Sequence, residues 1–180
     1  WISNSQRAFS NNSVAYTEKP DIGIFMKEWL SLYESKSGER GIFNRLAAKN
    51  TIKKLGGRRK INYDFGCNPC SEIILRPREF CNLTEVVVRK DDNLETLKDK
   101  IKVATILGTF QASLLHFRYI SRKWKQNCTE EALLGVSLTG IMDNDYLNGK
   151  KVLMHEGKSM ELKDILIEMR KTAYQTNLEW

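Results

Sequence analysis

The sequence predicts an α/β fold, because segments typical of strands alternate with segments typical of helices. Strands are expected at residues 82–89, which are rich in β-branched side chains, and at 133–143, an apolar run bracketed by glycines. Apolar residues follow helical spacing at 22–33, at 94–117 and from about residue 159 onward. With 41% hydrophobic and 28% charged residues, the 180-residue chain can bury one sizeable core, so we expect a single domain.

The N-terminal third predicts a loop, a helix and a second, shorter helix. Residues 1–16 are polar and irregular, whereas residues 22–33 form the first helix, with Asp21 as its N-cap. The segment 37–45 mixes two glycines, which end that helix, with charged residues. It therefore predicts a loop before a short helical stretch, which Gly56-Gly57 closes.

The remainder predicts two buried strands and two helices. The uniformly apolar residues 86–88 argue against a hairpin with one exposed face and favour a buried parallel strand. One of residues 91–93 caps the next helix, which we expect to be long and mostly buried along 94–117. A central strand and a turn are expected within 133–143, and a last helix at 159–180.

The net charge of +7 admits an anionic partner without identifying one. Solvated surface, nucleotide phosphates and nucleic acid could each explain the two basic groups, which are Lys53, Lys54, Arg58, Arg59 and Lys60, and Arg118, Arg122, Lys123 and Lys125. The sequence shows neither an apolar run of about 18 residues nor a secretory leader, so we expect a soluble, cytoplasmic protein. Four cysteines are too few for a secreted disulfide scaffold, and we expect reduced thiols.

The segment 65–74 carries the pattern with the most chemical content. Asn68, Cys70 and Glu72 occupy alternate positions, and Cys81 follows eleven residues after Cys70. In an extended or looped backbone, residues two apart point the same way, so an amide, a thiol and a carboxylate can converge on one small polar ligand. The pattern predicts an active site on a loop.

Cys67 and Cys70 also form a Cys-x-x-Cys pair, which leaves other interpretations open. The pair could be half of a zinc site in a basic nucleic-acid-binding module, or a thioredoxin-like redox pair. Zinc needs two further ligands, and the sequence offers Cys81, Cys128, His116 and His155 without a second Cys-x-x-Cys. We therefore expect no metal site, and the role of Cys67 stays open.

The run 65–74 resembles the cysteine finger loop of ribonucleotide reductases, and the interval to Cys81 is similar to that of the adenosylcobalamin-dependent class. Four other segments look like the same family: 11–13, 37–44, 84–86 and 135–144. The resemblance implies that residues 1–180 are a single partial domain, an internal portion of a ten-stranded α/β barrel built from two five-stranded halves. We then expect an effector loop before Trp1, and a phosphate-binding loop and shuttle cysteines after Trp180. The fragment alone should not catalyse turnover.

The resemblance also implies roles for individual residues. Cys70 would carry a thiyl radical, Glu72 would be the general base, and Asn68 would hold the substrate by hydrogen bonds. Cys81 would be one of two redox-active cysteines, with its partner upstream of Trp1.

The implied function is reduction of ribonucleotides to 2′-deoxyribonucleotides, with adenosylcobalamin as cofactor. The implied partners are a ribonucleoside triphosphate and a thioredoxin-type reductant, with neither nucleic acid nor membrane. A diphosphate-using relative is the alternative within the family.

Overall fold

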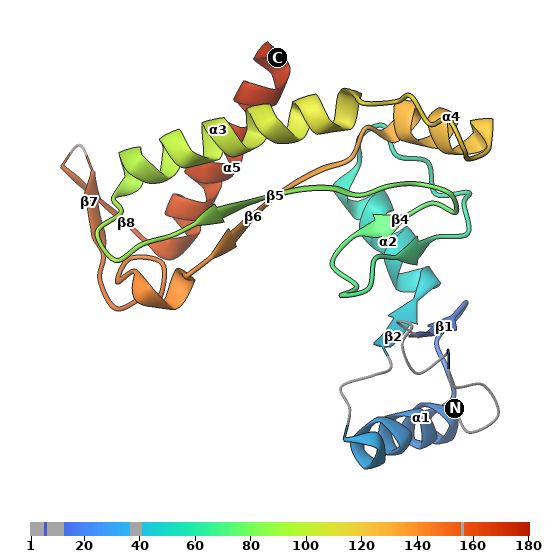
Figure 1. Ribbon diagram of the computed structural model, residues 1–180. Helices are drawn as coiled ribbons and strands as arrows, with labels where there is room; N and C mark the ends of the chain where they lie inside the picture. The colour runs from blue at the N-terminus through green and yellow to red at the C-terminus, as the bar shows by residue number, and fades with distance from the viewer. Residues whose placement is uncertain (1–5, 7–12, 37–40, 156) are drawn as a thin grey trace. The chain divides into compact units, whose positions relative to one another are not determined.

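The computed structural model describes residue 6 and residues 13–36, 41–155 and 157–180 (Figure 1). The fold is mixed α/β. Its described residues group into two compact units, each with a buried hydrophobic cluster of its own. Unit 1 contains the described residues up to Phe80 together with Arg122–Asn127, and unit 2 contains Cys81–Ser121 and Cys128–Trp180.

Unit 1 begins with a strand, a helix and a second strand. β1 (Ser13–Tyr16) pairs in parallel with β2 (Gly41–Asn44), and α1 (Ile22–Ser35) lies between them in the sequence. The side chain of Asp21 accepts hydrogen bonds from two backbone N–H groups in the first turn of α1. The predicted helix and its N-cap are confirmed.

Two expectations for unit 1 are wrong in part. Residues 13–16 and 41–44, expected to be irregular and loop, form β1 and β2, because each segment finds its strand partner in the other. Helix α1 ends at Ser35, and Lys36 follows with a left-handed backbone at φ 51°. Residues 1–5 and 7–12 of the irregular segment, and residues 37–40, which include Gly38, lie outside the described residues.

The rest of unit 1 is a helix followed by a small hairpin. α2 (Arg45–Leu55) is the predicted short helix, and it ends at Gly56, whose φ of 68° suits glycine. Beyond it, β3 (Gly66–Cys67) and β4 (Ile74–Leu75) pair antiparallel. The core of unit 1 joins β2, α2 and the hairpin, and its buried members are Phe43, Ala48, Ile52 and Phe65.

Unit 2 is built on a parallel strand pair covered by helices. β5 (Asn82–Val87) pairs with β6 (Leu134–Thr139) in parallel, as predicted for these segments. α3 (Leu94–Ser113) packs against both strands, and α5 (Leu162–Glu179) packs against α3 (Figure 1). The core of unit 2 contains Val86, Val88, Leu94, Leu97, Ile101, Ala104, Leu147, Leu153, Ile165 and Met169.

Shorter elements complete unit 2, and one further helix has residues in both units. A 3₁₀ turn, η2 (Ile141–Asp143), follows β6 and is the predicted turn. The hairpin of β7 (Leu153–His155) and β8 (Lys158–Met160) occupies the start of the predicted last helix, so α5 begins at Leu162 rather than near Ser159. α4 (Arg122–Glu131) was not expected from the sequence.

The expected burial of β5 and α3 is only partly correct. Val86 and Val88 are buried, but Val87 between them is 43% exposed, so burial alternates along the strand instead of being uniform. Helix α3 is capped by Asn93 as predicted, yet Leu107 and Phe110 in its second half are 58% and 67% exposed. Only the first part of α3 is a core helix.

The strands of the described chain pair two by two, and none of these small sheets is closed into a barrel. Among the helices of the described ranges, none has the length and apolar character needed to cross a membrane.

Candidate functional site

The loop between β3 and β4, residues 68–73, is closed at its neck by Asn68. The N–H of Ile73 donates to Asn68 Oδ1 at 3.0 Å, and the N–H of Asn68 donates to the carbonyl of Ile73 at 3.3 Å. At the tip, the N–H of Ser71 donates to the carbonyl of Asn68 at 3.0 Å. The segment is therefore a loop on a hairpin and not a helix, which confirms the predicted conformation.

The three predicted site residues differ in exposure. Asn68 is buried, whereas Cys70 and Glu72 are exposed at the tip of the loop. The side-chain oxygen of Asn68 is already used as the acceptor for the backbone N–H of Ile73, at the neck of the loop. Among the described residues, no hydrogen bond engages Asn68 Nδ2, so this group can donate to a ligand. That all three side chains face one cavity stays a prediction.

The cysteines do not pair with one another. None of Cys67, Cys70, Cys81 and Cys128 forms a disulfide. Cys67 is half-buried, and its Sγ lies 3.4 Å from the Oγ of Ser71, which has a left-handed backbone at φ 65°. Cys70 belongs to unit 1, and Cys81 belongs to unit 2, directly before β5.

Three separate segments of unit 1 meet near this loop. A Cβ atom placed on Gly41 would lie 2.5 Å from Ser13 Oγ and 3.7 Å from Ser71 Oγ. Ser13 can lie this close to residue 41 only because that residue is a glycine, which has no side chain. Ser13, Gly41 and the loop around Cys70 all belong to segments that resemble the reductase family. The structure thus brings together three of the five, although residues 11, 12 and 37–40 lie outside the described residues.

Two arginines hold the base of the hairpin, a role that the sequence did not indicate for either of them. Arg45, the first residue of α2, donates from Nε to the carbonyl of Phe65 at 3.0 Å. Arg59 donates from a terminal guanidinium nitrogen to the carbonyl of Ile74 at 2.7 Å. Both bonds end on backbone carbonyls far along the sequence, and no sequence pattern reports such a bond.

Arg76, directly after β4, is buried and packs on an aromatic ring. The guanidinium carbon of Arg76 lies 3.9 Å from the ring centroid of Tyr63, a cation–π contact, and the backbone N–H of Arg76 donates to Glu79 Oε2 at 2.7 Å. These contacts hold the base of the hairpin, whereas Cys70 and Glu72 at its tip are exposed.

The other two family-like segments lie side by side in unit 2. Glu85 of β5 is in register with Ser137 of β6. The second segment ends at Asn144, which is fully buried and whose side chain makes four hydrogen bonds. Its Nδ2 donates to the carbonyls of Arg89 and Asp92, and its Oδ1 accepts the N–H groups of Tyr146 and Leu147. Asn144 therefore has a structural role here.

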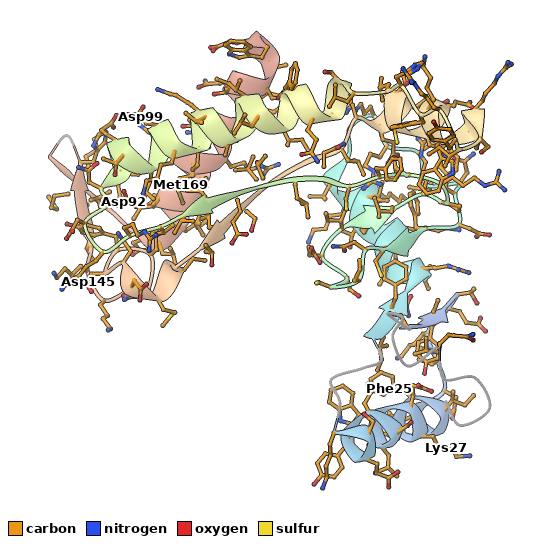
Figure 2. The ribbon with its side chains drawn as sticks, in the orientation of Figure 1. Phe25, Lys27, Asp92, Asp99, Asp145 and Met169 are labelled. Carbon is orange, nitrogen blue, oxygen red and sulfur yellow. The ribbon has the colours of Figure 1, made fainter. Side chains whose placement is uncertain are left out.

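Asp92 lies two residues before the start of α3 (Figure 2) and accepts several hydrogen bonds. It accepts hydrogen bonds from the N–H of Arg89, from Thr96 Oγ1 and from Lys100 Nζ. Burial raises the pKa of Asp92, but the bonds from Lys100, Arg89 and Thr96 and the charge of Lys100 outweigh burial. The pKa of this carboxyl is therefore below its usual value.

No protein-family model, curated protein or solved structure matches the chain. The family resemblance therefore rests on the residues of five segments of the sequence. Within the ranges that the structure describes, no three His, Cys, Asp or Glu side chains come together to hold a metal ion. The zinc interpretation of Cys67 and Cys70 has no support among these residues.

Proposed function

We propose that the chain is part of the catalytic barrel of an adenosylcobalamin-dependent ribonucleotide reductase and reduces ribonucleotides to 2′-deoxyribonucleotides. One observation carries the proposal. The loop with the Asn68-x-Cys70-x-Glu72 pattern sits at the end of a hairpin whose base is fixed, and its thiol and carboxylate are exposed at the tip. A radical thiol needs that combination of accessibility and fixed position to reach one hydrogen of a sugar.

Cys70 is assigned the radical step because a thiyl radical suits hydrogen transfer from a sugar. The S–H bond and an activated sugar C–H bond have comparable strengths, so hydrogen can move in either direction. The Cys70 thiyl takes the hydrogen atom from C3′, which leaves a thiol on Cys70 and a radical on C3′. The C3′ radical activates the neighbouring C2′–OH bond, which otherwise has a poor leaving group.

Glu72 and Asn68 act on the same sugar. The carboxylate of Glu72 removes the proton of the 3′-hydroxyl, and the 2′-hydroxyl departs as water with a proton supplied by one of the two reducing thiols. Asn68 Nδ2 donates a hydrogen bond that orients the substrate, while its Oδ1 keeps the loop closed at Ile73. One amide then connects the position of the substrate to the shape of the loop.

Cys81 is assigned to the supply of electrons. Of the two thiols, one gives its proton to the departing water and the other gives its hydrogen to C2′, and the two sulfurs join in a disulfide. Glu72 then returns its proton to the 3′-oxygen, Cys70 returns its hydrogen to C3′ and becomes a thiyl radical again, and a thioredoxin-type reductant reduces the disulfide. The Cys81 thiol is free and half-buried. Its proposed partner is a cysteine outside the present sequence.

The described residues of unit 1 do not by themselves fit adenosylcobalamin, because Cys70 is exposed and nothing in that unit encloses it. The proposal of this cofactor class depends on the interval from Cys70 to Cys81 and on the flanking segments. It assigns the enclosure of Cys70 to segments outside the described residues. A ribonucleoside triphosphate is the proposed substrate, and a diphosphate is the alternative.

The proposal is tested with Glu72→Gln in the complete enzyme, assayed for deoxynucleotide formation. Removal of the base should lower kcat by roughly two to four orders of magnitude and leave KM within a few-fold. Asp64→Asn, an exposed carboxylate shortly before β3, is the matched control and should retain activity. Near-normal turnover by Glu72→Gln would contradict the assigned base, and assays with triphosphates and diphosphates would identify the substrate.

A further inference from the structure

We infer that Arg59 is a positioning residue for Cys70: from the segment that follows α2, it holds the β3–β4 hairpin in place through β4 and through the residue directly before β3. The inference rests on the proposed function for its catalytic meaning and on contacts in unit 1 for its geometry. Each strand of the hairpin has only two residues, and a two-stranded hairpin of that size is not stable by itself in water. Contacts beyond the ladder must fix it.

Arg59 contacts β4 and the residue directly before β3 at once. Its guanidinium donates to the carbonyl of Ile74 in β4 at 2.7 Å, and its central carbon lies 5.5 Å from the ring centroid of Phe65, which precedes β3. The Phe65 side chain is completely buried, so the ring is a fixed surface. Because guanidinium is planar, one group can stack on a ring and donate in its own plane, which an ammonium cannot do.

Arg45 supports the same hairpin from the opposite end of α2. It donates to the carbonyl of Phe65, so the backbone of that residue is held by Arg45 and its ring is covered by Arg59. Arg45 is the first residue of α2, and Arg59 follows Gly56, the residue that ends this helix. The position of the Cys70 loop is thereby coupled to α2 at two points.

This coupling predicts which backbone amides exchange faster when Arg59 is replaced. The hydrogen bonds between Asn68 and Ile73 close the loop only while β3 and β4 keep their register. Loss of the charged hydrogen bond to Ile74 should raise amide exchange at residues 68 and 73 by roughly tenfold, the typical worth of such a bond. The amide of Val88, which bonds Thr139 in unit 2, should not change.

The experiment compares Arg59→Ala, Arg59→Lys and the control Lys60→Ala, an exposed neighbour of the same charge, in the whole chain by hydrogen exchange. Arg59→Ala should lose protection at residues 68 and 73 but keep it at Gly56 and Val88, and Arg59→Lys should restore it in part. In the complete enzyme, Arg59→Ala should lower kcat roughly tenfold with KM little changed, because chemistry depends on placement of Cys70.

Two results would overturn the inference: unchanged exchange at residues 68 and 73 in Arg59→Ala, or equal loss of protection at Gly56 and Val88, which would mean general destabilisation. Failure of the proposed function is recognised separately. It would appear as normal reduction by a variant without the Cys70 thiol, whatever the exchange pattern of the Arg59 variants.

Discussion

The side-chain oxygen of Asn68 accepts a hydrogen bond from the N–H of Ile73 at 3.0 Å, across the neck of the loop that carries Cys70. Asn68 is therefore already engaged by the fold before any substrate binds. A residue proposed to contact substrate through its amide nitrogen holds its own loop through its amide oxygen. The two functions of one side chain can be separated by substitution.

Asn68→Asp keeps an oxygen acceptor for Ile73 but loses the Nδ2 donor, whereas Asn68→Ala loses both. Asn68→Asp should retain amide protection at residue 73 and still lose most nucleotide reduction in the complete enzyme. Asn68→Ala should lose the protection as well as the activity. Hydrogen exchange and turnover are measured on both, and full activity of Asn68→Asp would show that Nδ2 has no part in substrate binding.

Gly140→Ala should destabilise unit 2. Gly140 has φ of 75°, and a Cβ there would collide with the backbone carbonyl oxygen of Val88, which cannot move away like a flexible side chain. We expect a loss of roughly 2 to 4 kcal/mol in the free energy of unfolding, measured with urea.

Gly149→Ala is the matched control, because Gly149 has φ of 78° but nothing within 4 Å of the added Cβ. It should cost only about 1 kcal/mol, the price of a left-handed alanine. Equal losses for the two variants would show that the contact with Val88 has no effect.

Asp92 should give unit 2 a stability that depends on acid pH. The pKa of its carboxyl is lower in the folded chain than its ordinary value of 3.8, so its stabilisation is complete above that value. It is lost as the pH falls through the lower, folded-state pKa. Asp92→Asn should be less stable at neutral pH and lose less stability on acidification than the unaltered chain, as measured by urea unfolding across that range.

Asp99→Asn, on the exposed side of α3, is the control for this prediction. Asp99 pairs with Lys102 at 3.4 Å, and both side chains are largely exposed. Such surface pairs contribute little. An acid dependence that is the same in Asp92→Asn and in the unaltered chain would contradict the role of Asp92.

The elements predicted correctly are those with local signals. Asp21 and Asn93 cap their helices through neighbouring N–H groups, and Gly56 ends α2 through its own backbone conformation. By contrast, β1 and β2 depend on each other across α1, and neither has a strand pattern of its own. Helix α4 has too few apolar residues for a helical pattern, with Trp124 and Cys128 as its only nonpolar side chains.

The residues of the candidate site and their loop could be predicted from the sequence, but the contacts that hold the loop could not. The alternation of Asn68, Cys70 and Glu72 indicated a loop with chemistry, and the loop is present. The pattern assigned Asn68 to substrate alone, because its bond to Ile73 depends on the register of β3 and β4. The contact of Arg59 with Ile74 spans 15 residues and ends on a backbone carbonyl, so no side-chain pattern marks it.

The most direct test of the radical role of Cys70 is deoxynucleotide formation by Cys70→Ser in the complete enzyme, with Cys67→Ser as the control on the same hairpin. An alcohol O–H bond is too strong for serine to replace the thiyl, so Cys70→Ser should form no deoxynucleotide while it still binds the ribonucleotide. Cys67→Ser should remain active, because its thiol has no assigned role in the reaction: it hydrogen-bonds with Ser71 and packs against the core of unit 1. Near-normal deoxynucleotide formation by Cys70→Ser would contradict the account.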